Sequence, residues 1–227
     1  MQKNGRLIIF RHGQTQYNVE KRMTGHTNIP LTQEGIAQGK RIGGVLKQLE
    51  IDILYASPLD RAQDTLKLAL DASETHESLK NEHEEWDIRT RFDLIEKDVG
   101  DFAGVNHKTD PRLKQHPQTY DSRLPNGESN KDVVERIQVF YESELKPLID
   151  DGKTVCISCH AVVLKAFMVV LGDITGDQMR GGVKIPNATP WIVDYQDGQK
   201  LSSQYVDPEK VINKTVFVPK PKFPNQR

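Results

Sequence analysis

The stretch Leu7-Ile8-Ile9-Phe10-Arg11-His12-Gly13-Gln14-Thr15 places a cation and an imidazole directly after a short apolar run. Four large apolar residues between two glycines are typical of a buried strand. In an open α/β sheet, ligands bind at the carboxyl ends of the strands. Arg11 offers a planar guanidinium that suits a phosphate, and His12 can act as a nucleophile, a general base or a metal ligand. Alone, Arg-His-Gly fits an exposed loop equally well, so the rest of the chain has to decide.

Length and charge indicate one globular domain without a nucleic-acid or membrane partner. The chain has 227 residues, 36% of them hydrophobic, and a formal net charge of −1. This balance provides no basic field for nucleic acid or an anionic membrane surface. The sequence shows no secretory-leader pattern and no apolar run of membrane-spanning length, so we expect a cytoplasmic protein.

Apolar runs and helical spacings alternate along the chain. Strands are predicted over 7–10, 51–56, 89–95, 154–158 and 190–195, with a hairpin turn at Asp197-Gly198. Helices are predicted to begin at Thr32, Leu59, Ser129 or Asn130, and Val162. This alternation favours an α/β fold, a three-layer sandwich with a mostly parallel central sheet and helices on both faces. Pro147 is expected to kink or end the helix in which it lies.

We expect a single domain over residues 1–215, followed by an extended or disordered tail over 216–227. The tail is predicted because its residues are rich in proline and lysine. A cap or insert is expected around 73–125, because residues 73–88 and 106–123 are polar and weakly periodic.

Basic and imidazole groups follow several of the predicted strands. Arg11 and His12 follow the first strand, Arg61 lies in the helix after the second, and His160 follows the strand over 154–158. The carboxyl ends of parallel strands meet at one edge of a sheet, so we expect these groups to converge. Clustered cations repel one another unless an anion lies between them, and guanidinium groups bind phosphate well. The pattern therefore predicts a phosphate site.

The two cysteines, Cys156 and Cys159, have the CxxC spacing of a redox or zinc pair. A strand places residues i and i+3 on opposite faces, and no second cysteine pair exists to complete a zinc site. We therefore expect two ordinary buried thiols, with a zinc or redox pair as the alternative. Free thiols suit a reducing cytoplasm.

Taken in order, the motifs resemble the histidine phosphatase superfamily, in its phosphoglycerate-mutase-like branch. The resemblance extends from Leu7 to about Tyr195. Arg-His-Gly alone is a weak signal, but the whole set in this order is specific. The motifs are Arg11-His12-Gly13-Gln14-Thr15-Gln16-Tyr17-Asn18, Met23-Thr24-Gly25, Leu31-Thr32-Gln33-Glu34-Gly35, Ser57-Pro58-Leu59-Asp60-Arg61-Ala62-Gln63-Asp64-Thr65, Glu96 with Gly100 and Gly104, Gly127-Glu128-Ser129, and Cys159-His160.

This resemblance implies phosphoryl transfer through a phosphohistidine on His12, whose other ring nitrogen donates to a backbone carbonyl. Cationic side chains take the electrostatic role of a metal, so no metal is implied. Glu96 would protonate the leaving oxygen and then activate the incoming water or alcohol. The implied catalytic residues are His12, Glu96, His160, Arg11 and Arg61. The implied phosphate-binding residues are Arg11, Asn18, Thr24, Gly25, Arg61 and His160.

Some of these assignments have close competitors in the sequence. Glu96 stands among other carboxylates, and its spacing to Gly100 and Gly104 favours it over Glu85, Asp87, Asp93, Asp98 and Asp101. Glu128 either assists the site or serves a turn and a helix cap. Three further histidines, His26, His107 and His116, are interpreted as surface residues.

The chain departs from the mutases of this branch in the residues that hold phosphoglycerate. The usual Tyr, Lys and Arg pair are replaced by Val99, by His107 at or near the Lys position, and by Pro117-Gln118 before Thr119-Tyr120-Asp121. The second histidine is normally followed by Gly and, in mutases, Asn, with an Arg beyond them. Ala161, Val162 and Lys165 stand there instead, and Arg112, Lys114 or Arg123 are candidate substitutes for the Arg pair.

Loss of two guanidinium contacts weakens the grip on a bisphosphorylated intermediate, by about 1.5–3 kcal/mol per charged hydrogen bond. Hydrolysis needs only the phosphoryl-transfer core. We therefore expect a phosphatase that acts on small phosphorylated metabolites and requires no cofactor. The alternative is a glycolytic isomerase, a phosphoglycerate mutase primed by 2,3-bisphosphoglycerate. A catalytically silent phospho-ligand binder is a more distant alternative. The sequence leaves open whether the chain is a monomer or a homo-oligomer.

Overall fold

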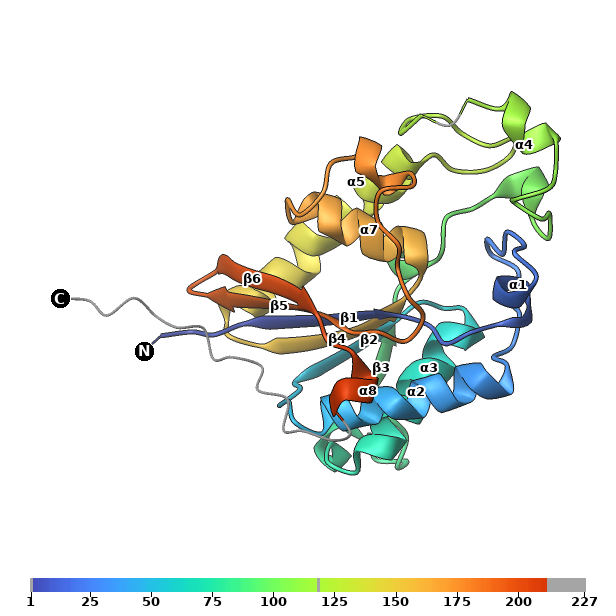
Figure 1. Ribbon diagram of the computed structural model, residues 1–227. Helices are drawn as coiled ribbons and strands as arrows, with labels where there is room; N and C mark the ends of the chain where they lie inside the picture. The colour runs from blue at the N-terminus through green and yellow to red at the C-terminus, as the bar shows by residue number, and fades with distance from the viewer. Residues whose placement is uncertain (1, 118, 212–227) are drawn as a thin grey trace.

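The structure is a computed structural model that describes residues 2–117 and 119–211 (Figure 1). Gln118 and the predicted tail over 216–227 lie outside the described residues. In the described ranges no helix is both long and apolar enough to cross a bilayer.

One six-stranded sheet forms the centre of the molecule, with strand order β3-β2-β4-β1-β5-β6. β1 pairs in parallel with β4, β4 with β2, and β2 with β3. β5 and β6 form an antiparallel hairpin beside β1, with its turn at Asp197-Gly198 as predicted. The strands are β1 (Arg6–Arg11), β2 (Ile53–Ala56), β3 (Ile88–Thr90), β4 (Thr154–Cys159), β5 (Trp191–Gln196) and β6 (Gln199–Tyr205).

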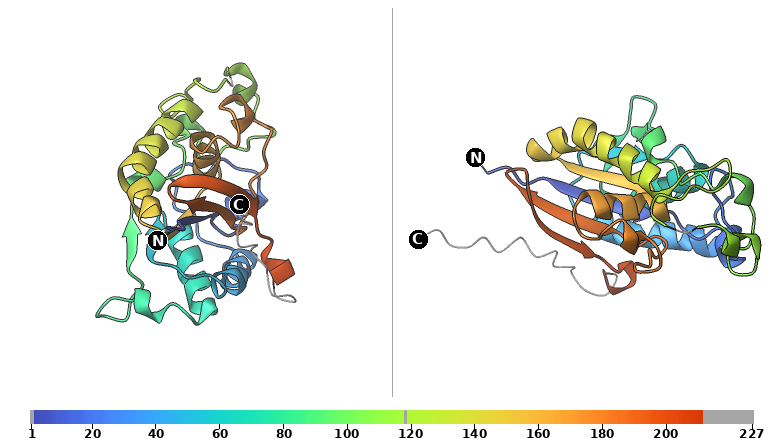
Figure 2. Two further views of the ribbon diagram at one scale, coloured as in Figure 1. Left: turned by 90° about the vertical axis from the view of Figure 1, so that its left-hand side faces the viewer. Right: turned by 90° about the horizontal axis from the view of Figure 1, so that it is seen from above.

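Helices cover both faces of this sheet (Figure 2). Side chains along β1 alternate between two cores, because successive residues of a strand point to opposite faces. Leu7 and Ile9 pack with α5 and α7, whereas Ile8 and Phe10 pack with α2 and α3. The predicted α/β sandwich with a mostly parallel sheet is confirmed. The long helices are α2 (Gln33–Leu46), α3 (Asp60–Ser73), α5 (Asn130–Phe140) and α7 (Ala161–Val170).

Side-chain caps set the starts of two of these helices. Thr32 Oγ1 accepts a hydrogen bond from Gly35 N at 3.0 Å at the start of α2. Ser129 and Asp132 cap the start of α5 reciprocally, with Asp132 N donating to Ser129 Oγ at 3.0 Å. Both caps satisfy backbone N–H groups that have no partner within the helix.

The helix predicted to kink or end at Pro147 continues past it. A π-helical turn, Tyr141–Leu145, follows α5 and leads into α6 (Lys146–Asp150), with Pro147 in its first turn. The π-helical turn directly before Pro147 interrupts the regular α-helical hydrogen bonding, which accommodates the missing N–H of the proline. The remaining short elements are α1 (Gln16–Val19), α4 (Arg112–Gln115), α8 (Pro208–Val211) and the 3₁₀ turns Glu77–Leu79, Phe92–Leu94, Gly100–Phe102 and Asp177–Met179.

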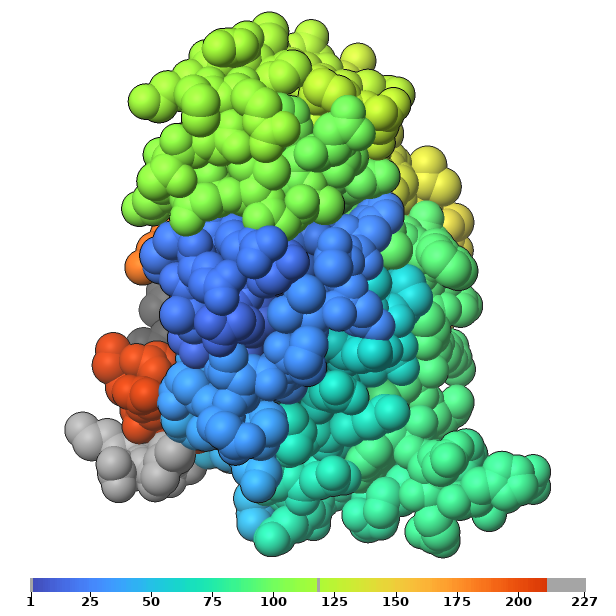
Figure 3. All heavy atoms as spheres, turned by 90° about the vertical axis from the view of Figure 1, so that its right-hand side faces the viewer, coloured from blue at the N-terminus to red at the C-terminus, as the bar shows by residue number. Residues whose placement is uncertain are grey.

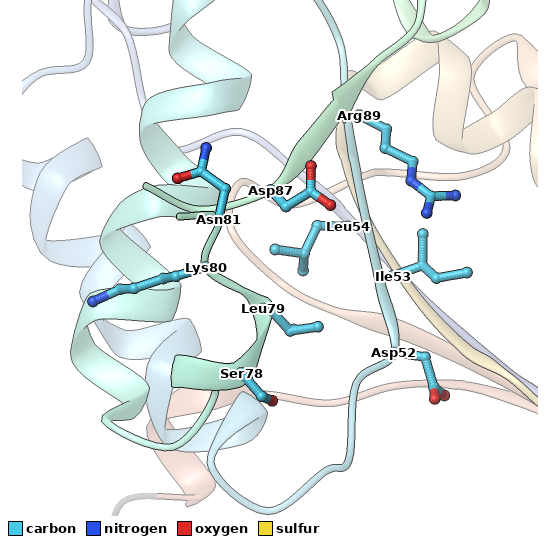
Figure 4. A pocket seen from close by; sticks show the side chains of 9 residues that line it. All are labelled: Asp52, Ile53, Leu54, Ser78, Leu79, Lys80, Asn81, Asp87 and Arg89. Atoms are coloured by element: carbon cyan, nitrogen blue, oxygen red, sulfur yellow. The ribbon is translucent and has the colours of Figure 1, made fainter. Parts of the chain in front are cut away.

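The two halves of the predicted insert lie at opposite ends of the sheet. Residues 77–87 lie beside the end of α3, where Trp86 Nε1 donates to Asp71 Oδ1 at 2.8 Å. Together with the start of β2 they line a small hollow (Figure 4). Its lining residues are Asp52, Ile53, Leu54, Ser78, Leu79, Lys80, Asn81, Asp87 and Arg89. Since β1 and β2 run in the same direction, this hollow is at the end of the sheet away from His12. Residues 77–87 thus form a surface segment at the far end of the sheet, and the expected cap or insert around 73–125 stays a prediction.

The later half of the insert lies at the end of the sheet where His12 stands. Met23 N donates to Val105 O at 2.8 Å, and Gly104 N donates to Met23 O at 2.7 Å. Figure 3 shows the light-green segment around 100–125 against the blue segment that follows β1. A cap over the site stays a prediction for this half of the insert.

Candidate active site

His12 stands at the end of β1 and is almost fully buried, with 2% of its surface exposed. Its Nδ1 lies 2.6 Å from Gly13 O, which can only accept, so Nδ1 carries the proton and Nε2 keeps its lone pair. Arg61 Nε donates to that Nε2 at 3.2 Å. Burial, and after it the charges of Arg11 and Arg61, lowers the pKa of His12 well below its ordinary value. The ring is thus a neutral imidazole with a lone pair in a site of positive charge.

Gly13 fixes the turn that follows the histidine. Its N donates to Thr65 Oγ1 at 2.9 Å, and Thr65 Oγ1 donates to Arg61 O at 2.6 Å on α3. A Cβ at Gly13 would lie 2.4 Å from Gly35 O, so only glycine lets this turn approach the start of α2. The carbonyl that orients His12 is therefore held by two helices.

Arg61 lies in the first turn of α3 and is fully buried. Besides His12, it contacts two backbone carbonyls: Nη1 donates to Thr27 O at 2.9 Å and Nη2 to Gly25 O at 3.0 Å. Burial lowers the pKa of Arg61 to about 10, so the group stays charged at neutral pH. Gly25 has φ +50°, a left-handed conformation that glycine adopts without strain. Arg61 thus binds the loop around Thr24 and Gly25 to His12.

Arg11 is the last residue of β1, and its guanidinium is held by a residue far along the chain. Nη1 donates to Ile185 O at 3.1 Å, while Nε is buried without a partner in the described part of the chain. Burial lowers the pKa of Arg11, and the charge of Glu96 opposes that shift. The unpaired Nε–H is a donor available to an oxyanion.

His160 follows β4 and is fully buried. Its ring centroid is 5.2 Å from that of His12, and its Nε2 is 2.7 Å from Ser57 Oγ. Nδ1 is buried and has no partner among the described residues. Burial, followed by the charge of Arg61, lowers the pKa of His160 well below its ordinary value. Buried polar atoms are normally paired, so two unpaired nitrogens on Arg11 and His160 indicate a ligand with hydrogen-bonding oxygens.

Glu96 is half-buried in the segment that follows Phe92–Leu94. Its Oε1 accepts from Lys97 N at 2.9 Å, and its carbonyl oxygen is 2.7 Å from His26 Nε2. The negative charge of Glu96 raises the pKa of both Arg11 and Arg61 against the effect of burial. The carboxylate therefore lies within electrostatic reach of the cations around His12.

Asn18 joins this group through α1. Its Oδ1 accepts from Thr15 N at 3.1 Å and from Asn187 Nδ2 at 3.3 Å. Asn187, in the loop before β5, also donates to His12 O at 2.8 Å. Thr24 lies in the loop that Arg61 holds, and its O accepts from Thr27 N at 3.1 Å. The fold thus brings the phosphate-binding residues that the sequence predicts into one region.

Glu128 contacts the Glu96 segment: Asp98 N donates to Glu128 Oε2 at 2.8 Å, and Arg136 Nε donates to Glu128 Oε1 at 3.1 Å. The sequence interpretation assigned no role to four residues that support the site, namely Ser57 and Thr65, which it quoted only within a motif, and Arg136 and Asn187. Thr65 lies one helical turn after Arg61, and Ser57 ends a predicted strand, so both had a local signal. Arg136 and Asn187 had none, because only the tertiary fold brings them near.

The three histidines interpreted as surface residues differ in exposure. His26 and His107 are exposed. His116 is half-buried, with its ring 5.2 Å from that of Phe102. The surface interpretation is therefore confirmed for the first two, while a neighbouring aromatic ring partly covers His116.

Two of the three basic residues considered as substitutes for the mutase Arg pair are engaged elsewhere. Arg112 pairs with Asp110 at 2.7 Å, and Arg123 pairs with Asp132 at 2.5 Å. Lys165 Nζ donates to Met179 O at 2.6 Å.

Cys156 and Cys159 are free, buried thiols on opposite faces of the sheet. Burial raises the pKa of both. The prediction of two ordinary buried thiols is confirmed, and the zinc or redox pair is wrong because the two sulfurs face different cores. Within residues 2–117 and 119–211, no group of three or more His, Cys, Asp or Glu side chains is placed to hold a metal ion.

Comparison with known proteins agrees with this geometry. A 2,3-bisphosphoglycerate-dependent phosphoglycerate mutase of Bifidobacterium longum is 30% identical over 90% of this chain and 93% of its own. One of Mesorhizobium japonicum is 34% identical over 84% and 91%. The solved structure of YhfR from Bacillus stearothermophilus has a TM-score of 0.72 and 27% identity, covering 87% of this chain and 94% of its own.

A mycobacterial glucosyl-3-phosphoglycerate phosphatase, solved in complex with VO3, has a TM-score of 0.65 and 25% identity, covering 83% of this chain and 92% of its own. The family profile described as histidine phosphatase superfamily (branch 1) matches residues 7–208. Members of this superfamily are phosphatases or mutases, so the resemblance seen in the motifs is confirmed. The chain belongs to the histidine phosphatase superfamily, in its branch 1.

Proposed function

We propose that this protein is a metal-independent phosphatase that hydrolyses small phosphomonoesters through a phosphohistidine on His12. One observation carries the proposal. The Nε2 lone pair of a buried, neutral His12 faces Arg61, while unpaired nitrogens of Arg11 and His160 lie in the same site. A nucleophile surrounded by fixed donors is what a phosphoryl group needs, because the negative charge of its transition state spreads over three oxygens.

In the first step, His12 Nε2 attacks phosphorus and forms a P–N bond, while the bond from phosphorus to the ester oxygen breaks. Arg11, Arg61 and His160 bind the phosphoryl oxygens, and the hydrogen bond from Nδ1 to Gly13 O stabilises the positive charge that develops on the ring. Glu96, as a carboxylic acid, gives its proton to the leaving oxygen.

In the second step, the carboxylate of Glu96 accepts a proton from water, whose oxygen attacks the phosphohistidine. The P–N bond breaks, inorganic phosphate leaves and His12 recovers its lone pair. The same side chain thus serves as acid and then as base.

Two observations favour hydrolysis over mutase activity. Arg112 and Arg123 already have carboxylate partners, and Val99 is buried where the mutases of this branch carry a Tyr. A mutase must retain a bisphosphorylated intermediate, and fewer free cations bind it less well. The names of the curated relatives favour the second candidate, a phosphoglycerate mutase in which 2,3-bisphosphoglycerate phosphorylates His12.

The test uses purified protein with a panel of phosphomonoesters, and with 3-phosphoglycerate in the presence and absence of 2,3-bisphosphoglycerate. His12→Asn removes the nucleophile, and His83→Asn, at an exposed histidine far from the site, is the matched control. Phosphate release that His12→Asn abolishes and His83→Asn preserves supports the phosphatase. Formation of 2-phosphoglycerate much faster than phosphate release, and dependent on the bisphosphate, establishes the mutase instead.

A catalytically silent binder makes a third outcome recognisable. Such a protein would bind phosphomonoesters without forming an acid-labile phosphohistidine. A reaction with ³²P-labelled substrate, quenched during turnover, tests for this intermediate. The intact nucleophile and acid, His12 and Glu96, argue against it. Free thiols at Cys156 and Cys159 are consistent with a cytoplasmic enzyme that acts on small metabolites.

A further inference from the structure

Arg136 of α5 holds the stretch of backbone that precedes Glu96. Its Nη1 donates to Asp93 O, and its Nη2 donates to Ile95 O at 2.8 Å. Asp93 lies in the short 3₁₀ turn Phe92–Leu94 and Ile95 directly follows it, so neither carbonyl belongs to an α-helix or a strand ladder. One guanidinium therefore ties the approach to Glu96 to a long, packed helix.

Glu128 holds the stretch of backbone that follows Glu96. Asp98 N donates to Glu128 Oε2 at 2.8 Å, and Glu128 N donates back to Asp98 O at 2.9 Å. Arg136 also pairs with Glu128, through Nε to Oε1 at 3.1 Å. The two side chains thus form one unit that contacts the main chain before and after Glu96.

The pair is well shielded from solvent, since the side chains of Arg136 and Glu128 are 18% and 25% exposed. Charge-assisted hydrogen bonds of a planar guanidinium are directional, and a lysine ammonium in its place cannot make the same fork of contacts. In contrast, among the described residues the Glu96 carboxylate accepts one hydrogen bond, from the adjacent Lys97 N at 2.9 Å. Its position therefore depends on how the backbone around it is held.

We propose that Arg136 and Glu128 are a positioning pair that holds the Glu96 carboxyl at the distance needed to protonate the leaving oxygen. The inference rests on the proposed function, in which Glu96 is the general acid. Neither member of the pair touches the substrate. A misplacement of 1 Å in a reacting group can cost about 100-fold in rate, so loss of the fork should act on proton transfer.

The experiment separates proton transfer from the rest of catalysis by the choice of leaving group. p-Nitrophenyl phosphate releases a stable phenolate and needs little protonation, whereas an alkyl ester such as glycerol 2-phosphate needs a proton on its leaving oxygen. kcat/KM is measured for both esters in the wild type, Glu96→Gln, Arg136→Lys and Glu128→Gln. Thermal unfolding of each variant checks that it is folded.

Arg91→Lys is the matched control. Arg91 binds Glu144 with Nε at 2.9 and 3.0 Å from the two carboxylate oxygens, and so ties the start of the same segment to the π-helical turn after α5. It lies five positions before Glu96 and contacts none of the backbone groups around it. A merely structural role for Arg136 would make the two Arg→Lys substitutions behave alike.

We expect Arg136→Lys to lower kcat/KM for the alkyl ester at least about tenfold more than for the aryl ester, with Glu96→Gln giving the same pattern more strongly. Glu128→Gln should show a smaller selective loss, and Arg91→Lys none. Equal losses on both esters in Arg136→Lys, or no loss, overturn the positioning pair while Glu96→Gln still supports the acid. If Glu96→Gln itself loses both activities equally, the assignment of the acid in the proposed function fails instead.

Discussion

Arg61 Nε lies 3.2 Å from His12 Nε2, so a buried guanidinium contacts the lone pair that would attack phosphorus. The lone pair cannot accept this hydrogen bond and bond to phosphorus at the same time. When the phosphoryl group arrives, the N–H must pass to one of its oxygens. The contact therefore keeps His12 neutral and oriented before the reaction, and becomes a contact to the transition state during it.

Arg61→Lys should remove most of the activity. Lysine keeps a positive charge but cannot reach Gly25 O, Thr27 O and His12 with one planar fork. Loss of one fixed donor to a transition state costs about 10²–10³ in kcat. Steady-state kinetics on a phosphomonoester measures the loss. Arg41→Lys, on the exposed side of α2, is the control and should keep full activity.

The same substitution should lower stability. Gly25 O and Thr27 O lose their partner. Gly25 is buried, and an unsatisfied buried acceptor costs about 1–3 kcal/mol, whereas Thr27 is exposed and its carbonyl can bind water. Urea unfolding of Arg61→Lys and wild type gives the difference in the free energy of unfolding. An unchanged stability would contradict the inference that Arg61 holds the loop around Thr24 and Gly25.

Stability should fall as the pH drops below about 6.5, because the folded state lowers the pKa of both His12 and His160. Above that pH both rings are neutral in the folded and the unfolded chain. Below that pH, the two histidines bind protons in the unfolded chain but stay neutral in the folded chain. Each histidine therefore lowers the free energy of unfolding by about 1.4 kcal/mol per pH unit until its folded pKa is reached.

Urea unfolding between about pH 5 and 7 measures this slope. The double variant with His12→Asn and His160→Asn should lose the part of the slope that the two buried rings cause. His83→Asn, at an exposed histidine, should retain it. An identical slope in the double variant would assign the pH dependence to other groups.

Oxyanions should stabilise the protein against heat. Inorganic phosphate or orthovanadate binds the cations around His12, and a ligand at 100 times its Kd adds about 2.7 kcal/mol to the folded state. For a chain of this size that is roughly a 5–10 °C rise in Tm. Sodium chloride at equal ionic strength is the control, and a rise of the same size in salt alone would speak against a phosphate site. Arg61→Lys should show a much smaller rise.

Gly13→Ala should destabilise the protein by about 1–3 kcal/mol, because its new Cβ would lie 2.4 Å from Gly35 O. Activity should fall as well, since the Gly13 carbonyl orients His12. Gly39→Ala on α2 is the control, because its methyl group would lie 3.2 Å from Leu68 Cβ, a much looser contact than the one at Gly13. Denaturant unfolding compares the two, and a Gly13 variant as stable as Gly39→Ala would contradict the close approach.

The sheet and the convergence of His12, Arg61 and His160 were predictable from the sequence. Each residue follows a strongly apolar strand, and parallel strands place their carboxyl ends at one edge. The edge strand β3 was harder to bound, because it has three residues and two of them are exposed. An apolar pattern over 89–95 therefore suggested a strand where a 3₁₀ turn, Phe92–Leu94, follows instead.

The placement of the insert was not predictable from local pattern. Residues 73–88 are polar and weakly periodic, which is as typical of a loop at the far end of the sheet as of a cap. Their position follows from the length of α3, which carries the chain away from His12. The contacts of Arg136 and Asn187 likewise depend on tertiary neighbours more than 40 residues away in the chain.

The contacts that Arg136 and Glu128 make around Glu96 separate two parts of the site. Strands and packed helices position His12, Arg61 and His160. Residues 99–125 instead belong to a loop that begins after Asp98 and ends before Glu128, two residues that are hydrogen-bonded to each other. Because both ends of this loop are held by one pair of residues, its length and sequence can change without moving His12, Arg61 or His160. Changes in the length or sequence of this loop should therefore alter the surface beside the site while His12, Arg61 and His160 keep their positions.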